Sequence, residues 1–379
     1  MSPALTKTLS LLVLIGIGYL FRNKIKNKDQ RDGIKTLILS LALPATIFIA
    51  LLQVDFQMDM IAIPVLALGF NIIIFLLMDK LPLGSVFGIA PNQYRTLVML
   101  IPSLAPGLSC FPFIMEYSGQ EPVALAALAD IGNKVFVLII LYTVAMKWYY
   151  ARNEQAAPKG KGKIKGLLIA MVNEPVNMVI ITAIAMLSVG LSYTTFPEFI
   201  TLSIDRLSLM MTPLVLLFIG FSVRLTFDQV RSIFSFLFFR SGIAFFLSGV
   251  LLLIFPVSSP EIILLIIVFP QSACSFWPYA HMAAVGQLEK KSMAEGRGKT
   301  FDLDFAMNVL ACSLPFSVLL IMGVYSGREY ITSVPSIFIA SAVFFGVGLF
   351  IVVLTSKLSS LFKPDTVQMK IEMQESGQE

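Results

Sequence analysis

The chain has 379 residues, of which 57% are hydrophobic and 13% are charged, and its formal net charge is +5. A typical soluble domain has about 45–50% apolar and about 25% charged residues, so this composition excludes an ordinary soluble protein and indicates a chain that lies in a bilayer. Basic loop residues and anionic lipid headgroups account for the positive charge, so we expect membrane lipid as a partner and no nucleic acid.

Eleven stretches are long and apolar enough to span a membrane as helices, for which about 20 residues are needed. We therefore expect an all-α polytopic membrane protein. The first stretch is followed by a basic run instead of a small-residue cleavage site, so a cleavable signal peptide is not expected. The stretches are about 5–21, 36–54, 60–78, 96–118, 122–146, 167–191, 199–223, 232–256, 260–284, 305–325 and 336–355.

Lysine and arginine gather in alternate loops, which is the pattern of cytoplasmic loops in membrane proteins. Residues 22–35 and 147–166 hold six each, and residues 287–300 hold four. This distribution predicts a multi-pass protein of the cell membrane, inner or plasma, with its N-terminus outside and its C-terminus in the cytoplasm. The opposite loops, 55–59, 119–121, 192–198 and 257–261, hold none.

A polar linker rich in Gly and Pro follows the fifth predicted helix. The helices on its two sides look alike, because "LSLALPATIFIALL" (39–52) and "LSLMMTPLVLLFIGF" (207–221) share a leading Leu-Ser-Leu and a proline. Five is an odd number, so two such halves would have opposite topology and form an inverted repeat. We predict a first repeat at 1–150, a cytoplasmic linker at 151–166, a second, inverted repeat at 167–325, and an eleventh helix with a cytoplasmic tail at 326–379.

The fourth helix of each predicted repeat is interrupted by prolines, in "PGLSCFP" (106–112) and "PQSACSFWP" (270–278). Proline frees backbone groups, which in hydrocarbon must be satisfied by partner helices, side chains or a water-filled cavity. A single proline is commonly only a kink, but paired interruptions indicate a substrate site near the midplane. Trp277 and Tyr279 are either ligand-stacking residues or ordinary anchors. The predicted helix-break residues are Pro106, Pro112, Pro270 and Pro278, and the predicted substrate-binding residues are Gly107, Ser109, Cys110, Gln271, Ser272, Cys274 and Ser275.

Acidic and amide residues lie one turn apart in the fifth helix of each predicted repeat. Ionisable residues at membrane depth are functional candidates by default, so these residues are predicted to hold a coupling proton or a sodium ion. Alternatives stay open: Asp130 can pair internally with Lys134, and Asp304 lies near a cytoplasmic end, where N-capping is common. His281 either handles a proton or is a hydrogen-bonded core residue. The predicted coupling residues are Asp130, Asn133, Asp304, Asn308 and His281, with sodium as the alternative to a proton at Asp130 and Asn133.

Catalysis finds no support in the sequence. No Ser-His-Asp order, zinc-type Cys/His spacing or Gly-rich nucleotide loop occurs, and the chain has one histidine. We therefore expect no enzyme activity, no metal site and no resident cofactor. Arg240 and the Asp205–Arg206 pair are interpreted as snorkelling or locally paired residues. The three cysteines, Cys110, Cys274 and Cys312, lie in apolar stretches, which predicts buried thiols and no disulfide framework.

Three segments carry a resemblance to a known family: "LILSLALPATIF" (37–48), "NEPVNMVIITAIAMLSVGL" (173–191) and "TPLVLLFIGFSV" (212–223). Over roughly residues 5–325 the chain resembles the auxin efflux carrier (PIN-like) permeases. The resemblance implies five plus five inverted helices, with fourth and ninth helices that are broken by prolines and cross at the substrate site. It also implies secondary transport of small organic anions such as carboxylates. The chain departs from the family pattern in having Ser-Cys and Gln-Ser instead of asparagines at the breaks, and in its eleventh helix.

The sequence therefore predicts a secondary transporter that carries a small organic solute, expected to be an organic anion, by alternating access around a midplane site. Half-helix N-termini at such a site favour an anionic group. The sodium-coupled bile-acid symporters resemble the same plan, so a sodium-coupled organic-acid symporter is the first alternative. A membrane ligand sensor that does not transport is the second, although no long soluble output domain is evident, and a channel is the third. Coupling to H+, to Na+ or to neither stays open, as does a homodimer.

Overall fold

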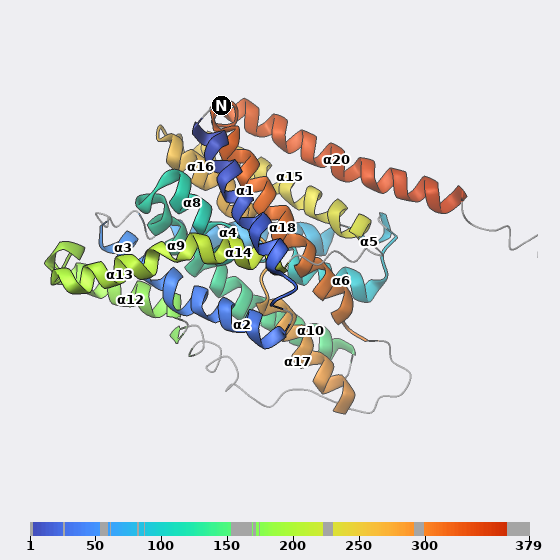
Figure 1. Ribbon diagram of the computed structural model, residues 1–379. Helices are drawn as coiled ribbons and strands as arrows, with labels where there is room; N and C mark the ends of the chain where they lie inside the picture. Colours follow the sequence, from blue (N-terminus) through green and yellow to red (C-terminus); the bar gives the residue numbers. More distant parts are fainter. Residues whose placement is uncertain are drawn as a thin grey trace, which may run out of the picture.

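The computed structural model describes residues 3–25, 27–53, 60, 62–81, 83–86, 88–152, 169, 172–173, 175–222, 230–291 and 299–361. In these residues the chain is a set of helices joined by loops, without a strand (Figure 1). The predicted linker lies outside the described residues except for its first two. The helices are α1 (Pro3–Phe21), α2 (Lys28–Leu37), η1 (Ile38–Ala42), α3 (Leu43–Leu52), α4 (Ala62–Lys80), α5 (Leu83–Val86), α6 (Pro91–Leu100), α7 (Pro106–Ser109), α8 (Phe111–Ser118), α9 (Gln120–Val135), η3 (Phe136–Ile140), α10 (Leu141–Arg152), α12 (Pro175–Ser188), η5 (Tyr193–Thr195), α13 (Glu198–Leu209), α14 (Met211–Ser222), α15 (Val230–Ile254), α16 (Pro260–Val268), η7 (Phe269–Gln271), α17 (Trp277–Lys291), α18 (Leu303–Ser326), α19 (Arg328–Ile331) and α20 (Val334–Leu361).

Seven helical segments in the described part are long and apolar enough to cross a membrane. Shorter apolar helices occur at Leu9–Phe21, Pro175–Ser188 and Pro260–Gln271. The chain is thus an all-helical protein of the multi-pass membrane type, as its composition predicts, while the eleven-span count and the inverted repeat stay predictions. The seven segments are Asp29–Leu52, Ala62–Lys80, Gln120–Arg152, Glu198–Phe221, Arg231–Ile254, Leu303–Ser326 and Val334–Ile351.

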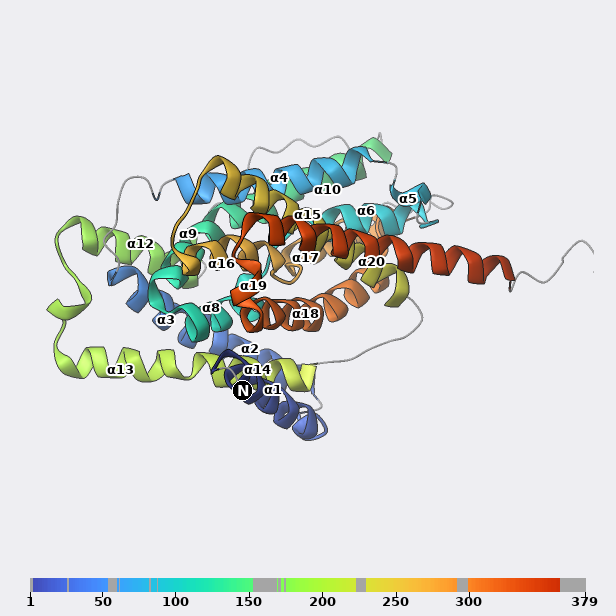
Figure 2. The ribbon, with the colours of Figure 1, turned by 90° about the horizontal axis from the view of Figure 1, so that it is seen from above.

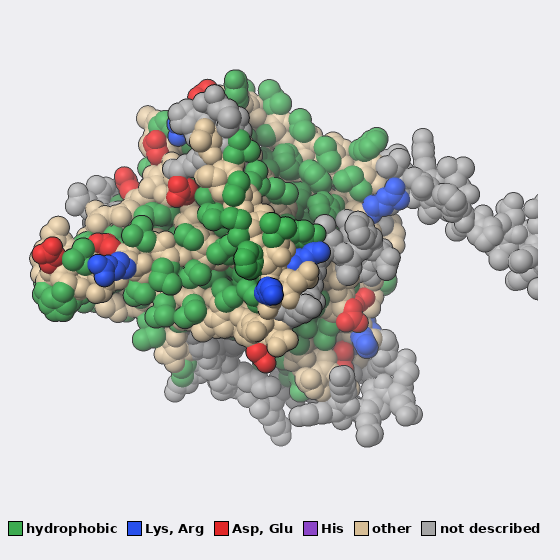
Figure 3. All heavy atoms as spheres, viewed as in Figure 1, with side chains coloured by type: hydrophobic (Ala, Val, Ile, Leu, Met, Phe, Trp, Pro, Cys, Tyr) green, Lys and Arg blue, Asp and Glu red, His purple; other side chains and the backbone are tan. Residues whose placement is uncertain are grey.

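The outer surface is apolar in a way that fits a lipid environment. Hydrophobic side chains cover much of the face shown in Figure 3, and the charged side chains on it are scattered. Helix α13 has no buried residue, and two of its large hydrophobic side chains are strongly exposed, Phe199 at 70% and Leu209 at 76%. Such surface would be unfavourable in water and is expected of a helix that faces acyl chains.

Three helix pairs make the most extensive contacts: α15 with α20, α1 with α14, and α4 with α9. Figures 1 and 2 show α20 lying beside α15 at one edge of the molecule. Glycine permits the other two close approaches, because a Cβ on Gly220 would contact the backbone of α1 and a Cβ on Gly132 would contact the carbonyl oxygen of Pro64 in α4. Small residues that let backbones approach are the usual means of packing helices in membranes.

The two segments predicted to be interrupted are each divided by a short non-helical stretch. Residues 101–105, here called the first break, separate α6 from α7, and residues 272–276, the second break, separate η7 from α17. The buried core has two hydrophobic clusters that meet at these breaks, since Ile101 and Leu104 of the first break belong to different clusters. The breaks therefore lie in the interior of the molecule.

Candidate functional site

The two breaks lie against each other and are joined by hydrogen bonds, and the place where they meet is called the crossing here. The amide of Ala105 donates to the carbonyl of Ala273 at 2.8 Å, and the amide of Ser275 donates to Oγ of Ser103 at 3.0 Å. As the residue number rises in one break it falls in the other, so the two segments run antiparallel. Each break thereby satisfies backbone groups of the other, which in an apolar interior would otherwise cost several kcal/mol each.

Ser109, in the turn of helix after the first break, ties the two breaks together. Its hydroxyl donates to the carbonyl of Ala105 at 2.8 Å and accepts the amide of Ala273 at 2.9 Å. The next residue, Cys110, directs its thiol to the carbonyl of Val268 at 3.7 Å. Both side chains are fully buried, so the structure gives them a bracing position at the crossing.

A cavity of about 630 Å³ lies beside the crossing. Its walls come from both breaks, from α2 and α3, from α9, and from α18. Cavities of about 300–1,000 Å³ are the usual size of small-molecule sites. Of the residues predicted from the sequence, Pro106, Gly107, Asp130, Asn133, Cys274 and Ser275 line this cavity.

Other predicted substrate-binding residues lie near the crossing but are not among the residues that line the cavity. Nε2 of Gln271 donates to the carbonyl of Ser241 at 3.3 Å, and the hydroxyl of Ser272 donates to the carbonyl of Phe269 at 2.6 Å. Ser109, Cys110 and Ser272 thus bond to carbonyls next to the breaks, whereas Gln271 ties the second break to α15.

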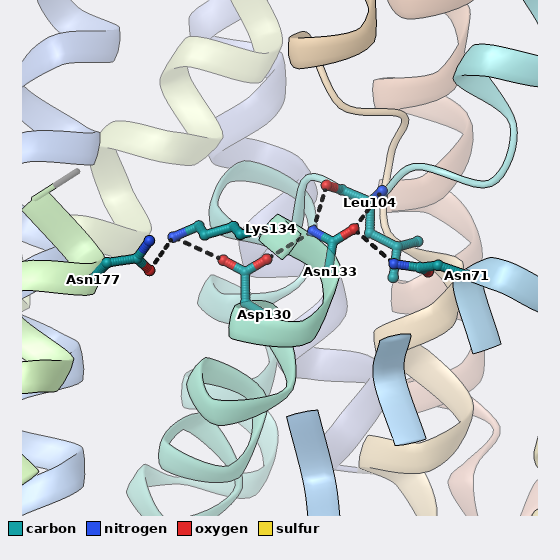
Figure 4. Close-up of polar contacts among 6 residues, drawn as sticks. All are labelled: Asn71, Leu104, Asp130, Asn133, Lys134 and Asn177. Atoms are coloured by element: carbon teal, nitrogen blue, oxygen red, sulfur yellow. Dashed lines mark hydrogen bonds and ion pairs between the residues drawn. The ribbon is translucent and has the colours of Figure 1, made fainter. Parts of the chain in front are cut away.

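A chain of buried polar side chains starts at the cavity wall and runs between helices (Figure 4). Nζ of Lys134 lies 3.2 Å from Oδ2 of Asp130 and donates to Oδ1 of Asn177 in α12 at 3.1 Å. Oδ1 of Asp130 accepts Nδ2 of Asn133 at 2.8 Å. The internal Asp130–Lys134 ion pair that the sequence left open is therefore formed, and both side chains are at most 7% exposed.

Asn133 holds the first break in place. Its Nδ2 donates to the carbonyl of Leu104 at 2.9 Å, while its Oδ1 accepts the amide of Leu104 and Nδ2 of Asn71, both at 3.1 Å. With the bond to Asp130, both donor hydrogens and both acceptor positions of the amide are in use. Asn71 lies in the middle of α4, and no residue near it in the sequence indicates that it bonds to Asn133.

Arg240 has the corresponding position at the second break. Its side chain is 2% exposed, and Nη2 donates to the carbonyls of Ser272 at 2.6 Å and Pro270 at 3.3 Å. The interpretation of Arg240 as a snorkelling or locally paired residue is thus wrong: the guanidinium lies inside the protein, where it binds the carbonyls that the broken helix exposes. Sequence spacing could not reveal these partners, because they lie 30 and 32 residues away.

The remaining predicted coupling residues do not meet at the cavity. Nε2 of His281 lies 2.9 Å from the carbonyl of Val137, and its ring packs edge-on to Tyr142. This is the hydrogen-bonded core position that was the alternative for His281. Asp304 is exposed, and the residue that caps α18 is Asp302, whose carboxylate accepts the amide of Phe305. Asn308 is half-buried and is not part of the cavity lining.

Lys35, in α2 just before the predicted second helix, lines the cavity, and the sequence had indicated only a loop charge at this position. Its Nζ lies 5.1 Å from the ring centroid of Phe276, within the range of a cation–π contact. Among the described residues it forms no ion pair. Trp277 also lines the cavity, whereas Tyr279 does not.

The prolines and cysteines singled out in the sequence have the following positions in the structure. Pro106, Pro112 and Pro278 lie in the first turns of α7, α8 and α17, and Pro270 lies in η7. The three cysteines are free and buried, as predicted. No group of three or more His, Cys, Asp or Glu side chains that could hold a metal ion occurs within the described ranges.

Comparison with known proteins finds a weak similarity to a transporter. No family model matches the chain. It is 24% identical over 221 residues to a protein of Methanocaldococcus jannaschii named "Uncharacterized transporter MJ1031", and the match covers 57% of this chain and 67% of that protein. The resemblance to the auxin efflux carriers stays a prediction at this level of identity.

Proposed function

We propose that this protein is a membrane carrier that binds a small organic anion, such as a carboxylate, in the cavity beside the two crossed breaks. The similarity to a protein named as a transporter supports the general function. The multi-pass helical architecture supports the same assignment. Transport would proceed by alternating access, with one group of helices rocking against the other around the site.

The single observation that carries the anion assignment is the cation in the cavity wall. Lys35 and Lys134 both line the cavity, whereas Asp130 is the only acidic residue among the described residues of its lining, and it is already paired with Lys134. Lys35 is therefore available to a negatively charged group. The N-terminal end of α17, represented in the wall by Trp277, adds the partial positive charge of a helix N-terminus.

The antiparallel crossing of the breaks supports alternating access around this site. An inverted repeat predicts that its two broken helices cross in opposite directions, and the pairing of Ser103 with Ser275 and of Ala105 with Ala273 follows that order. In this proposal the crossing is the pivot and the cavity is the compartment that opens alternately to the two sides.

The proposal is tested by thermal unfolding of the purified protein with a panel of small mono-, di- and tricarboxylates. At least one of them should raise the melting temperature, because a ligand that binds the folded state stabilises it. Lys35→Gln should weaken the affinity for that carboxylate about 10- to 100-fold, which corresponds to the loss of one hydrogen bond to a charged group.

The matched control is Lys24→Gln, because Lys24 is an exposed lysine of the same basic segment that does not line the cavity. It should leave the affinity unchanged. The anion assignment fails if no carboxylate stabilises the protein, or if both lysine variants bind it as well as the wild type does.

A further inference from the structure

Carriers with broken helices have places suited to a coupling cation. Freed carbonyls and the C-terminal ends of half-helices can coordinate sodium, and a buried carboxylate supplies the hard oxygen ligands that such ions prefer. The described part of this chain has both features: the carboxylate of Asp130 in the cavity wall, and the carbonyls of Pro270 and Ser272 at the second break.

The carboxylate of Asp130 is already neutralised by a cation of the chain. Its Oδ2 lies 3.2 Å from Nζ of Lys134, and its Oδ1 accepts a hydrogen bond from Asn133 at 2.8 Å. The amide oxygen of Asn133 accepts from both Asn71 and Leu104, so it has no acceptor position left for a metal ion. A sodium ion at Asp130 would have to displace the ammonium group of Lys134.

The carbonyls of the second break are likewise occupied by a cation of the chain. The guanidinium of Arg240 donates to Pro270 and Ser272, and the carbonyl of Ala273 accepts the amide of Ala105. Arg240 is always protonated, and no acidic side chain pairs with it among the described residues. Its charge is therefore compensated by the backbone dipoles that would otherwise attract an ion.

We propose that Lys134 and Arg240 are built-in counter-cations that take the place of a coupling ion, so that this cavity works without bound sodium. For the organic solute this rests on the proposed function, but the statement about sodium is independent of it. The sequence prediction of a sodium ion at Asp130 and Asn133 is thereby replaced by a lysine that neutralises Asp130 permanently.

The test measures sodium binding by the purified full-length protein with no organic solute present. Melting temperatures are compared in NaCl, KCl and choline chloride at equal ionic strength, and binding of radioactive sodium is measured in parallel. The wild type should melt at the same temperature in all three salts and bind no sodium. Lys134→Met frees the carboxylate of Asp130, so sodium alone should raise the melting temperature of this variant in a saturable way.

Matched variants separate a sodium site from a general loss of stability. Lys134→Arg keeps the cation and should stay insensitive to sodium. The double variant Asp130→Asn/Lys134→Met should lose the sodium response that Lys134→Met gains. If Lys134→Met does not fold, Lys134→Gln takes its place, because its amide can still donate to Asn177.

Two results would overturn the inference: saturable, sodium-specific stabilisation of the wild type, or a folded Lys134→Met or Lys134→Gln variant that shows no response to sodium. A failure of the carboxylate panel to stabilise the protein would affect the proposed function alone. A sodium-independent wild type with a sodium-dependent Lys134 variant would then still establish the built-in counter-cation.

Discussion

Replacing Asn133 with leucine is expected to destabilise the folded protein by about 3 kcal/mol. The change leaves the amide and the carbonyl of Leu104, and the side-chain amide of Asn71, without their hydrogen bonds to Asn133. It also removes the bond to Asp130, whose carboxylate keeps Lys134 as a partner. A buried polar group without a partner costs about 1–3 kcal/mol. The lower end applies here, because Leu104 lines the cavity and water can partly replace the lost bonds.

The assay is equilibrium unfolding of the purified variant in mixed micelles of a mild detergent and SDS, followed by tryptophan fluorescence. Thr143→Ala is the matched control, because Thr143 lies exposed on the same continuous helical segment and bonds only to the carbonyl one turn before it. A destabilisation by Asn133→Leu of less than about 1 kcal/mol, which is the value of a single ordinary hydrogen bond, would refute the view that Asn133 braces the first break.

Two further predictions follow from packing and from hydrogen bonding. Gly132→Ala should destabilise the protein by about 1–3 kcal/mol in the same unfolding assay, since the added methyl group meets the backbone of α4. The control is Gly69→Ala in α4, which should be neutral because a Cβ there meets no atom within 4 Å. His281→Gln should leave the pH profile of transport between about pH 5.5 and 8 unchanged, because the ring bonds to a carbonyl and does not line the cavity. A displaced profile would return His281 to the list of proton-handling residues.

The helices were predictable because a bilayer demands long apolar segments, and each predicted stretch contains helix. The second break, 272–276, falls within the predicted interruption at 270–278, whereas the first break, 101–105, lies just before the predicted interruption at 106–112. The prolines were expected inside the breaks, yet Pro106 and Pro278 lie in the first turn of the helix that follows each break. Proline has no backbone N–H, but the N–H groups of the first turn have no partner within the helix in any case. A proline can therefore begin the second half-helix, and the break lies before the proline.

The candidate site was predictable only where its partners are close in sequence. Asp130 and Lys134 are one turn apart on the same helix, so their pairing was an open alternative from spacing alone. Arg240 binds backbone carbonyls at the second break, and a sequence does not show which backbone carbonyls lack a helical partner. Lys35 looked like one more cytoplasmic charge, and only the fold shows that it lines the cavity.

For Ser109 and Gln271 the sequence indicated the position but not the role. Their polarity within apolar segments indicated a special position, and the structure gives them one at the crossing of the breaks. Polarity alone does not distinguish a side chain that contacts a solute from one that satisfies the backbone around the site, because both replace hydrogen bonds to water.

Counterflow in liposomes shows whether a small organic anion is carried through the cavity beside the crossed breaks. Vesicles containing the protein are loaded with an unlabelled carboxylate that stabilises it, and the uptake of the same labelled carboxylate is followed. We expect transient accumulation of label by the wild type and by Lys24→Gln, and much less by Lys35→Gln. Carboxylate binding without counterflow would contradict transport and favour a ligand sensor. Equal counterflow in all three proteins would show that the carboxylate does not pass through this cavity.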